Sequence, residues 1–193
     1  MLDAVEALAE LADEGAVDML IRVLGYYNPG AAVAAVDGLI RIGIPAASAL
    51  LSQIDGYNYG ARAWALRVLA GIGDPRGLDL ILETAEEDFS LSVRRAAARG
   101  LGSIQWERLS VDERKVAQQK SRDALLRVVG DTEWVVRYGA VAGLQGVAIA
   151  ATNEGFTELI EPIKHTLSGL VHDDDATAVR ARAQWALVQL SGS

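Results

Sequence analysis

The hydrophobic and polar positions of this chain repeat in a pattern anchored on arginine. Four segments carry an arginine, an alanine three residues later and a leucine seven residues later, and they begin at Arg62, Arg94, Arg137 and Arg180. A fifth segment, at Ala32, keeps the alanine and the leucine without the arginine. Offsets of three and seven residues lie on one face of a helix, so each segment predicts a helix that buries its alanine and its leucine.

Another amphipathic segment precedes each of these helices. The predicted first helices cover residues 17–24, 46–54, 78–85, 111–129 and 156–171. Ser110 and Glu113 have the spacing of a capping box for the longest of them. Residues 1–13 resemble half of a further unit. The repeats are about 30 residues long at first and about 43 later, which is typical of helical solenoids. We predict an all-α fold, a curved α-solenoid of about five to six helical-hairpin repeats, in a single domain over residues 1–193.

Aspartates stand at a regular distance before the arginines. Asp88, Asp131 and Asp174 precede the next repeat arginine by six residues, and Asp55 precedes Arg62 by seven. Carboxylates in the turns and arginines at the helix starts predict a ladder of charge-assisted hydrogen bonds within and between units. The repeat arginines are then structural. The form V-R-x-x-A-x-x-x-L and the Gly-Ile-Gly-Asp-Pro turn at 71–75 resemble the HEAT repeat, in the short variant of phycobilisome lyases.

The positions one and five residues after the repeat arginine lie away from the buried face, and in HEAT arrays they line the concave side. When the repeat units are aligned, these positions and the +2 position carry arginines and aromatic residues, which predicts that they line one groove. They are Trp64, Arg67, Arg95, Arg99 and Tyr138, and the surrounding loops add Tyr26, Tyr27, Tyr57 and Tyr59. The +2 position also holds Arg182. Such a groove suits a planar conjugated molecule with carboxylates, or an acidic, aromatic-rich protein partner.

Plainer interpretations stand beside this one. Arg95 and Arg99 equally fit a solvated helix face. Trp106, Trp134 and Trp185 fit packing in the core or between repeats as well as contact with a ligand. The two histidines, His165 and His172, have no partner at a metal-ligand spacing, so no metal site is expected.

Composition narrows the function. The formal charge of −8 disfavours a nucleic-acid binder, including a HEAT-type DNA glycosylase. Two histidines are too few for a di-iron HEAT hydroxylase. The chain has no cysteine, which fits a reducing compartment such as the cytosol. Its acidic start does not have the form of a secretory signal, and no apolar run reaches the length expected of a membrane span.

Residues 54–106, which include IDGYNYGARAWALRVLAGIGDPRGLDLI and DFSLSVRRAAARGLGSIQW, resemble the F subunit of the cyanobacterial E/F-type phycobilin lyases. The likeness in length and repeat order extends over the whole chain. It implies a heterodimer with an E-type subunit that attaches phycocyanobilin, as a substrate and not a bound cofactor, to a cysteine of the phycocyanin α subunit. Related lyase-isomerases carry a His-Cys motif. This chain has Tyr57-Asn58-Tyr59 in the corresponding loop, so the resemblance implies a lyase without isomerase activity.

The chemistry implied by the resemblance fits the predicted groove and leads to a hypothesis for the role of each residue. Arg67, Arg95 and Arg99 are expected to hold the bilin propionates, and the tyrosines with Trp64 to pack its rings. Tyr138 joins this bilin-binding set. Asp55, Tyr57 and Tyr59 are the candidates for proton transfer, although Asp55 also fits the turn and the ladder. The alternative function is a non-catalytic HEAT adaptor that binds phycobiliproteins during assembly or degradation.

Overall fold

The structure is a computed structural model, and it describes residues 1–53 and 59–191. Its described part is helical and begins with α1, Leu2–Leu11. The other helices are α2 Val17–Val23, α3 Pro29–Ile42, α4 Ile44–Gln53, α5 Tyr59–Ile72, α6 Leu78–Glu87, α7 Leu91–Gly100, α8 Val111–Val128, α9 Trp134–Glu154, α10 Ile160–Asp173 and α11 Thr177–Ser191.

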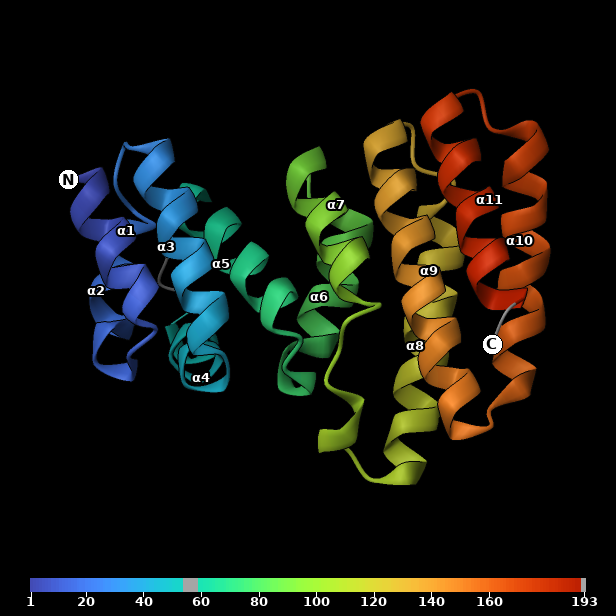
Figure 1. Cartoon of the computed structure of the whole chain (residues 1–193), viewed down its shortest axis with the longest axis horizontal. Coiled ribbons are helices and arrows are strands. Elements are labelled where there is room, and N and C mark those ends of the chain that lie inside the picture. The colour runs from blue at the N-terminus through green and yellow to red at the C-terminus, as the bar shows by residue number, and fades with distance from the viewer. Residues whose placement is uncertain (54–58, 192–193) are drawn as a thin grey trace.

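The helices stand in two rows that run the length of the molecule (Figure 1). The odd-numbered helices α1 to α11 each pack against the next odd-numbered helix, and the even-numbered helices form the second row. Each even-numbered helix forms a hairpin with the odd-numbered helix that follows it. The five hairpins and the single helix α1 confirm the predicted solenoid and its half unit at the start. We call the solvent side of the first row the odd-helix face.

The predicted register of the buried positions is confirmed. The alanines three residues after the repeat position are all buried: Ala35, Ala65, Ala97, Ala140 and Ala183. The leucines at +7 are buried in the first four hairpins, and Leu187 in the last is half-buried. Burial of a leucine side chain stabilises the fold by roughly 1.5–3 kcal/mol, so this stripe holds each hairpin to its neighbours.

The helix starts differ from the sequence pattern in a regular way. The repeat arginine is the fourth residue of its helix and not the first, because each helix begins directly after its turn. The sequence pattern predicted a helix over residues 156–171 in the last hairpin, but residues 156–159 lie before the start of α10. Gly155 ends α9 at a φ of 76°, and Thr157–Leu159 form a short 3-10 helix before α10 begins at Ile160. The capping box of Ser110 and Glu113 is present at the start of α8.

The hydrophobic core of the described residues is divided into two large clusters and a small third one, formed by Ala151, Leu159 and Ile160. One large cluster lies in α1 to α5, from Val5 to Ile72, and the other large cluster lies between Leu78 in α6 and Leu190 in α11. The two halves meet where α5 packs against α7, and a Cβ on Gly100 would lie 2.6 Å from the carbonyl oxygen of Ala70. This junction positions the cleft described below.

Helix α9 corrects one expectation from the sequence. Its 21 residues are long and apolar enough to cross a membrane, whereas the sequence pattern suggested that no segment was. In the structure, however, 61% of this apolar stretch is buried, and α9 packs against α7, α8 and α11. A helix that is apolar all round is also what the centre of a helical core requires.

Candidate functional site: an arginine-lined cleft

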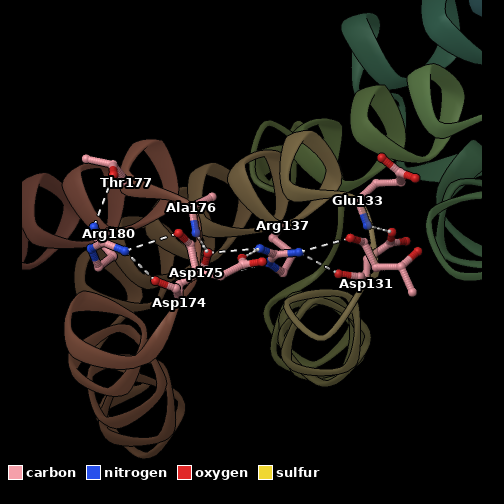
Figure 2. Close-up of polar contacts among 9 residues, drawn as sticks. Asp131, Glu133, Arg137, Asp174, Asp175, Ala176, Thr177 and Arg180 are labelled. Carbon is pink, nitrogen blue, oxygen red and sulfur yellow. Dashed lines mark hydrogen bonds and ion pairs between the residues drawn. The ribbon is translucent and has the colours of Figure 1, made fainter.

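The repeat arginines link neighbouring units through the turns. Arg94 donates from Nε and Nη2 to the carboxylate of Asp131, at 2.8 and 3.1 Å. Arg137 binds Asp174 in the same way, at 2.8 and 2.9 Å, and also contacts the carboxylate of Asp175 (Figure 2). The two members of each bidentate pair are 37 residues apart in the sequence. The predicted ladder between units is therefore present.

The contact within a unit differs from the sequence expectation. Arg94 donates from Nη1 to the backbone oxygen of Asp88 at 2.8 Å, and Arg137 donates likewise to that of Asp131 at 3.0 Å. The aspartate carboxylate instead accepts from the backbone N–H two residues later in its own turn, as Asp174 does from Ala176 at 2.8 Å (Figure 2). Arg94 and Arg137 thus each bind the backbone carbonyl of their own turn and the carboxylate of the next turn.

The ladder shifts the ionisation of its members. Hydrogen bonds from Arg137 hold the pKa of Asp174 below its usual value, against the opposing effect of burial. The same hydrogen bonds raise the pKa of Arg137. Arg94 and Arg137 are engaged in these structural hydrogen bonds. The other arginines of the odd-helix face are therefore the candidates for contact with a ligand.

A cleft of about 530 Å³ opens on the odd-helix face between α5 and α7. Arg67 of α5 and Arg95 and Arg99 of α7 all line it, as the sequence pattern predicts. Ile40 closes one side, and the small residues Ala70, Gly71, Ala96 and Gly100 form much of the rest. The cleft lies at the junction of the two large core clusters, where small residues leave room between the helices.

The three arginines give the cleft a positive charge that no described carboxylate neutralises by an ion pair. None of the three arginines forms an ion pair with a carboxylate of the described residues. Burial lowers the pKa of Arg67, and the positive charge of Arg95 lowers it further. Guanidinium groups that repel one another in a cleft favour an anionic ligand, and their planar shape suits carboxylates.

Trp64 connects this cleft to an aromatic pocket. The guanidinium of Arg67 lies over the Trp64 ring, 4.5 Å from its centroid. Trp64 also lines a separate pocket of about 410 Å³ together with Tyr26 and Tyr27 of the turn before α3. Ring surfaces and cationic groups therefore adjoin through a single stacked pair, which suits a flat molecule that carries acids.

Tyr138 lies outside the cleft. Its ring is 5.9 Å from the guanidinium of Arg182, which also stacks on Trp185 at 4.6 Å and donates to Gln145 at 2.7 Å. Burial lowers the pKa of Arg182, and Arg99 lowers it further by its charge. The sequence placed Arg182 on this face but did not single it out as a ligand residue. Arg182 stands two residues after its repeat arginine, as Trp64 does, and this shared position could have indicated a ligand-binding role.

The remaining candidates, Asp55, Tyr57 and Tyr59, come before α5 in the sequence or at its start. Asp55 and Tyr57 lie outside the described residues, and Tyr59 is the first residue of α5. The arginine of this unit, Arg62, occupies the same fourth helix position as the ladder arginines. Within residues 1–53 and 59–191, no group of three or more histidine, aspartate or glutamate side chains could hold a metal ion.

The stacked helical hairpins are those of a class of proteins, the HEAT-repeat proteins. The family model described as HEAT repeats matches residues 47–145. A phycocyanin alpha phycocyanobilin lyase, CpcF, from Synechocystis sp. is 50% identical over 187 residues, which are 97% of this chain and 85% of the relative. A phycobilisome maturation protein of Synechococcus elongatus is 51% identical over 96% of this chain and 88% of its own length.

Solved structures agree with these relatives. A chain from the complex of CpcE and CpcF of phycocyanin lyase from Nostoc sp. is 44% identical, with a TM-score of 0.79 over 90% of this chain and 99% of that one. A designed armadillo repeat protein, 18% identical, matches in fold alone with a TM-score of 0.56. The chain belongs to the HEAT-repeat family of phycocyanobilin lyase F, or beta, subunits.

Proposed function

We propose that this chain is one subunit of a two-chain lyase that joins phycocyanobilin to a cysteine of the phycocyanin α subunit. The observation that carries the proposal is the cleft of Arg67, Arg95 and Arg99, which has no carboxylate partner among the described residues. A bilin is flat and conjugated and carries two propionates. The arginines bind the propionates through charge-assisted hydrogen bonds, and Trp64 packs against a pyrrole ring.

The reaction adds the thiol of the acceptor across the ethylidene double bond of the bilin. A carbon–sulfur bond forms, the thiol loses its proton and the tetrapyrrole gains one, so that no oxidant is needed. This chain has no cysteine, and the sulfur comes from the acceptor. The contribution of the lyase is to hold the two reactants in the geometry of attack and to move protons.

We assign proton transfer to Asp55, Tyr57 and Tyr59. Tyr138 serves the bilin indirectly, because it packs against Arg182 and not in the cleft. Phycocyanobilin is a substrate in this proposal, and no cofactor is permanently bound. The absence of cysteine also favours a lyase without isomerase activity. Residues 1–193 act as one repeat domain, in the cyanobacterial cytosol beside the phycobilisome.

Reconstitution tests the proposal. The purified chain is mixed with an E-type subunit, phycocyanobilin and the apo α subunit of phycocyanin, and a covalent fluorescent adduct is measured after denaturing electrophoresis. Adduct that requires both chains supports the lyase. If a partner that binds this chain gives no adduct above the rate of the uncatalysed addition, the chain is instead a HEAT adaptor that binds phycobiliproteins.

A further inference from the structure

The aromatic pocket and the arginine-lined cleft follow one another along α5. Tyr26 and Tyr27, in the turn before α3, line the pocket together with Trp64 of α5. The cleft takes its α5 residues from Arg67 to Gly71, nearer the end of the helix. Trp64 and Arg67 stack on each other and are about 4.5 Å apart along the helix axis. One elongated molecule that lies along α5 would therefore enter both sites.

The two tyrosines of the pocket are presented by a fixed turn. The backbone N–H of Tyr26 donates to the oxygen of Val23 at 3.0 Å, and the N–H of Asn28 donates to the oxygen of Tyr26 at 2.8 Å. The Asn28 side chain caps α3 by accepting from Ala31 at 3.1 Å. Tyr26 is nevertheless 47% exposed, and Tyr27 is fully exposed. Tyrosine rings held in solvent beside a pocket are typical of a binding surface.

We propose that one bilin occupies both sites and lies along α5 with its ethylidene-bearing end ring in the aromatic pocket. In a linear tetrapyrrole the ethylidene group is on an end ring, and the propionates are on the two middle rings. An end ring packed on Trp64 has its neighbour, with the first propionate, beside Arg67. The inference rests on the proposed function, and it adds the direction of the bilin and a ring-binding role for Tyr26 and Tyr27.

The position of the proton-transfer residues selects the ethylidene end. The acceptor sulfur bonds to the exocyclic carbon of the ethylidene double bond, and a proton adds to the ring carbon, so the acid must be near this ring. Tyr59, which we assign to proton transfer, begins α5 and directly precedes Gly60, a residue that lines the pocket. The opposite direction would place the reacting ring near Gly71, about 18 Å along the helix from Tyr59.

Access for the acceptor favours the same direction. The thiol is carried by a second protein, so the reacting carbon must be reachable from outside the array. The aromatic pocket lies where α3 and α5 begin, beside the fully exposed Tyr27. The cleft lies between α5 and α7, whose backbones approach closely at Ala70 and Gly100. The pocket is therefore the end of the row that a protein-bound thiol can approach.

Single introduced cysteines test the direction, since the chain has no cysteine of its own. Tyr27→Cys places a thiol at the pocket. Ser103→Cys places one at the far end of the cleft, where Ser103 lies against Gly73, just past the end of α5. Each variant is mixed with the E-type subunit and phycocyanobilin without the α subunit, and bilin bound to this chain is located by peptide mass spectrometry. Asp79→Cys, at an 84% exposed side chain of α6, measures uncatalysed addition.

We expect Tyr27→Cys to be labelled at least about 10-fold faster than Asp79→Cys, because the bound ethylidene is held beside the thiol. Ser103→Cys should react no faster than Asp79→Cys. Faster labelling of Ser103→Cys than of Tyr27→Cys overturns the proposed direction. Tyr26→Cys is made in parallel, because Tyr27→Cys also removes a ring. Labelling of both tyrosine variants at the Asp79→Cys rate overturns the placement of the ring.

The role of the rings has its own test. Tyr26→Ala/Tyr27→Ala should weaken phycocyanobilin binding at least about 2- to 10-fold in an absorbance titration, the effect of losing one aromatic pair. Tyr26→Phe/Tyr27→Phe keeps both rings and should retain wild-type affinity. Because both tyrosines are exposed, neither double variant should lower the melting temperature. Wild-type affinity of the alanine variant removes the tyrosines from the site.

Transfer to the apo α subunit is measured separately with the wild-type chains. If they form the adduct while both tyrosine variants react at the Asp79→Cys rate, the placement of the bilin fails and the lyase proposal stands. If they form no adduct while Tyr27→Cys is labelled faster than both other cysteines, the lyase proposal fails and the placement stands.

Discussion

Arg137 binds the carboxylate of Asp174 through two parallel hydrogen bonds, from Nε at 2.8 Å and from Nη2 at 2.9 Å. The side chains are 11% and 3% exposed, so both charges are largely removed from water. They belong to neighbouring hairpins and join the start of α9 to the turn before α11. Removal of either side chain would leave the other charge buried without the attraction that offsets the cost of taking it out of water.

Replacement of Asp174 by alanine is expected to lower the free energy of unfolding by about 3 kcal/mol, because it leaves Arg137 buried without its main partner. Urea denaturation monitored by circular dichroism measures the change. The control is Asp79→Ala, since the Asp79 side chain is 84% exposed and its ion pair with Lys120 lies at the surface. We expect its effect to stay below about 1 kcal/mol. Equal losses for the two variants would contradict the structural role of the ladder.

The same pair predicts an acid limit of stability. Hydrogen bonds from Arg137 lower the pKa of Asp174 in the folded state relative to the unfolded chain. Its stabilising contribution is therefore complete above the unfolded pKa of about 3.9 and is lost as the pH falls through the lower, folded value. The melting temperature of the wild type should decline below about pH 4. Asp174→Asn should flatten this decline, and a decline of unchanged steepness would exclude Asp174 as a cause.

The close approach of α7 and α9 predicts a strong effect at a glycine. A Cβ on Gly143 would meet the carbonyl oxygen of Ala98 well inside van der Waals contact and would lie 2.9 Å from Cδ2 of Leu125. We expect Gly143→Ala to destabilise the fold by about 1–3 kcal/mol, because backbone on α7 cannot move aside cheaply.

The matched control is Gly169→Ala on the surface of α10, where a Cβ would have no neighbour within 4 Å. Helix propensity alone should then stabilise the protein by up to about 1 kcal/mol. Chemical denaturation of the two variants should give changes of opposite sign. A neutral Gly143→Ala would mean that the two helices separate more easily than this packing implies.

The repeat could be predicted from the sequence because it is encoded by residues only a few positions apart. The offsets of alanine and leucine from each arginine determine the buried face of a helix, and the aspartate six residues earlier determines the ladder. The existence of the cleft could not be derived in this way. It depends on the packing of α5 against α7 at the junction of two large core clusters, and on small residues such as Gly71 and Gly100 that line the cleft there.

Tyr138 shows the same limit at a single residue. Its helix offset predicted a place on the odd-helix face, and it lies there, half-buried. Its neighbour Arg182 comes from the next hairpin, 44 residues later in the sequence, and no local pattern links the two. Face and register follow from sequence periodicity, while the partner across a helix interface depends on tertiary packing.

Trp64 offers a test of the aromatic side of the site. Trp64→Leu keeps an apolar side chain but removes the ring under the Arg67 guanidinium. An aromatic pair contributes about 0.5–1.5 kcal/mol, so loss of the proposed contact between Trp64 and a pyrrole ring should weaken phycocyanobilin binding about 2- to 10-fold in an absorbance titration. Trp134→Leu is the control, because Trp134 is exposed at the start of α9 and lines neither pocket. Equal affinities of both variants would remove Trp64 from the bilin site.

The sharpest test of the cleft removes two arginines of α7 together. Arg95 and Arg99 are exposed and pair with no carboxylate of the described residues, so Arg95→Ala/Arg99→Ala should melt at or slightly above the wild-type temperature as repulsion with Arg67 is relieved. Hydrogen bonds to charged groups contribute about 1.5–3 kcal/mol each, so bilin transfer should fall at least about 10-fold. The affinity for phycocyanobilin should also lose most of its salt dependence, while the control Arg22→Ala/Arg108→Ala retains both. Normal transfer by the α7 double variant would show that these arginines form only a solvated helix face.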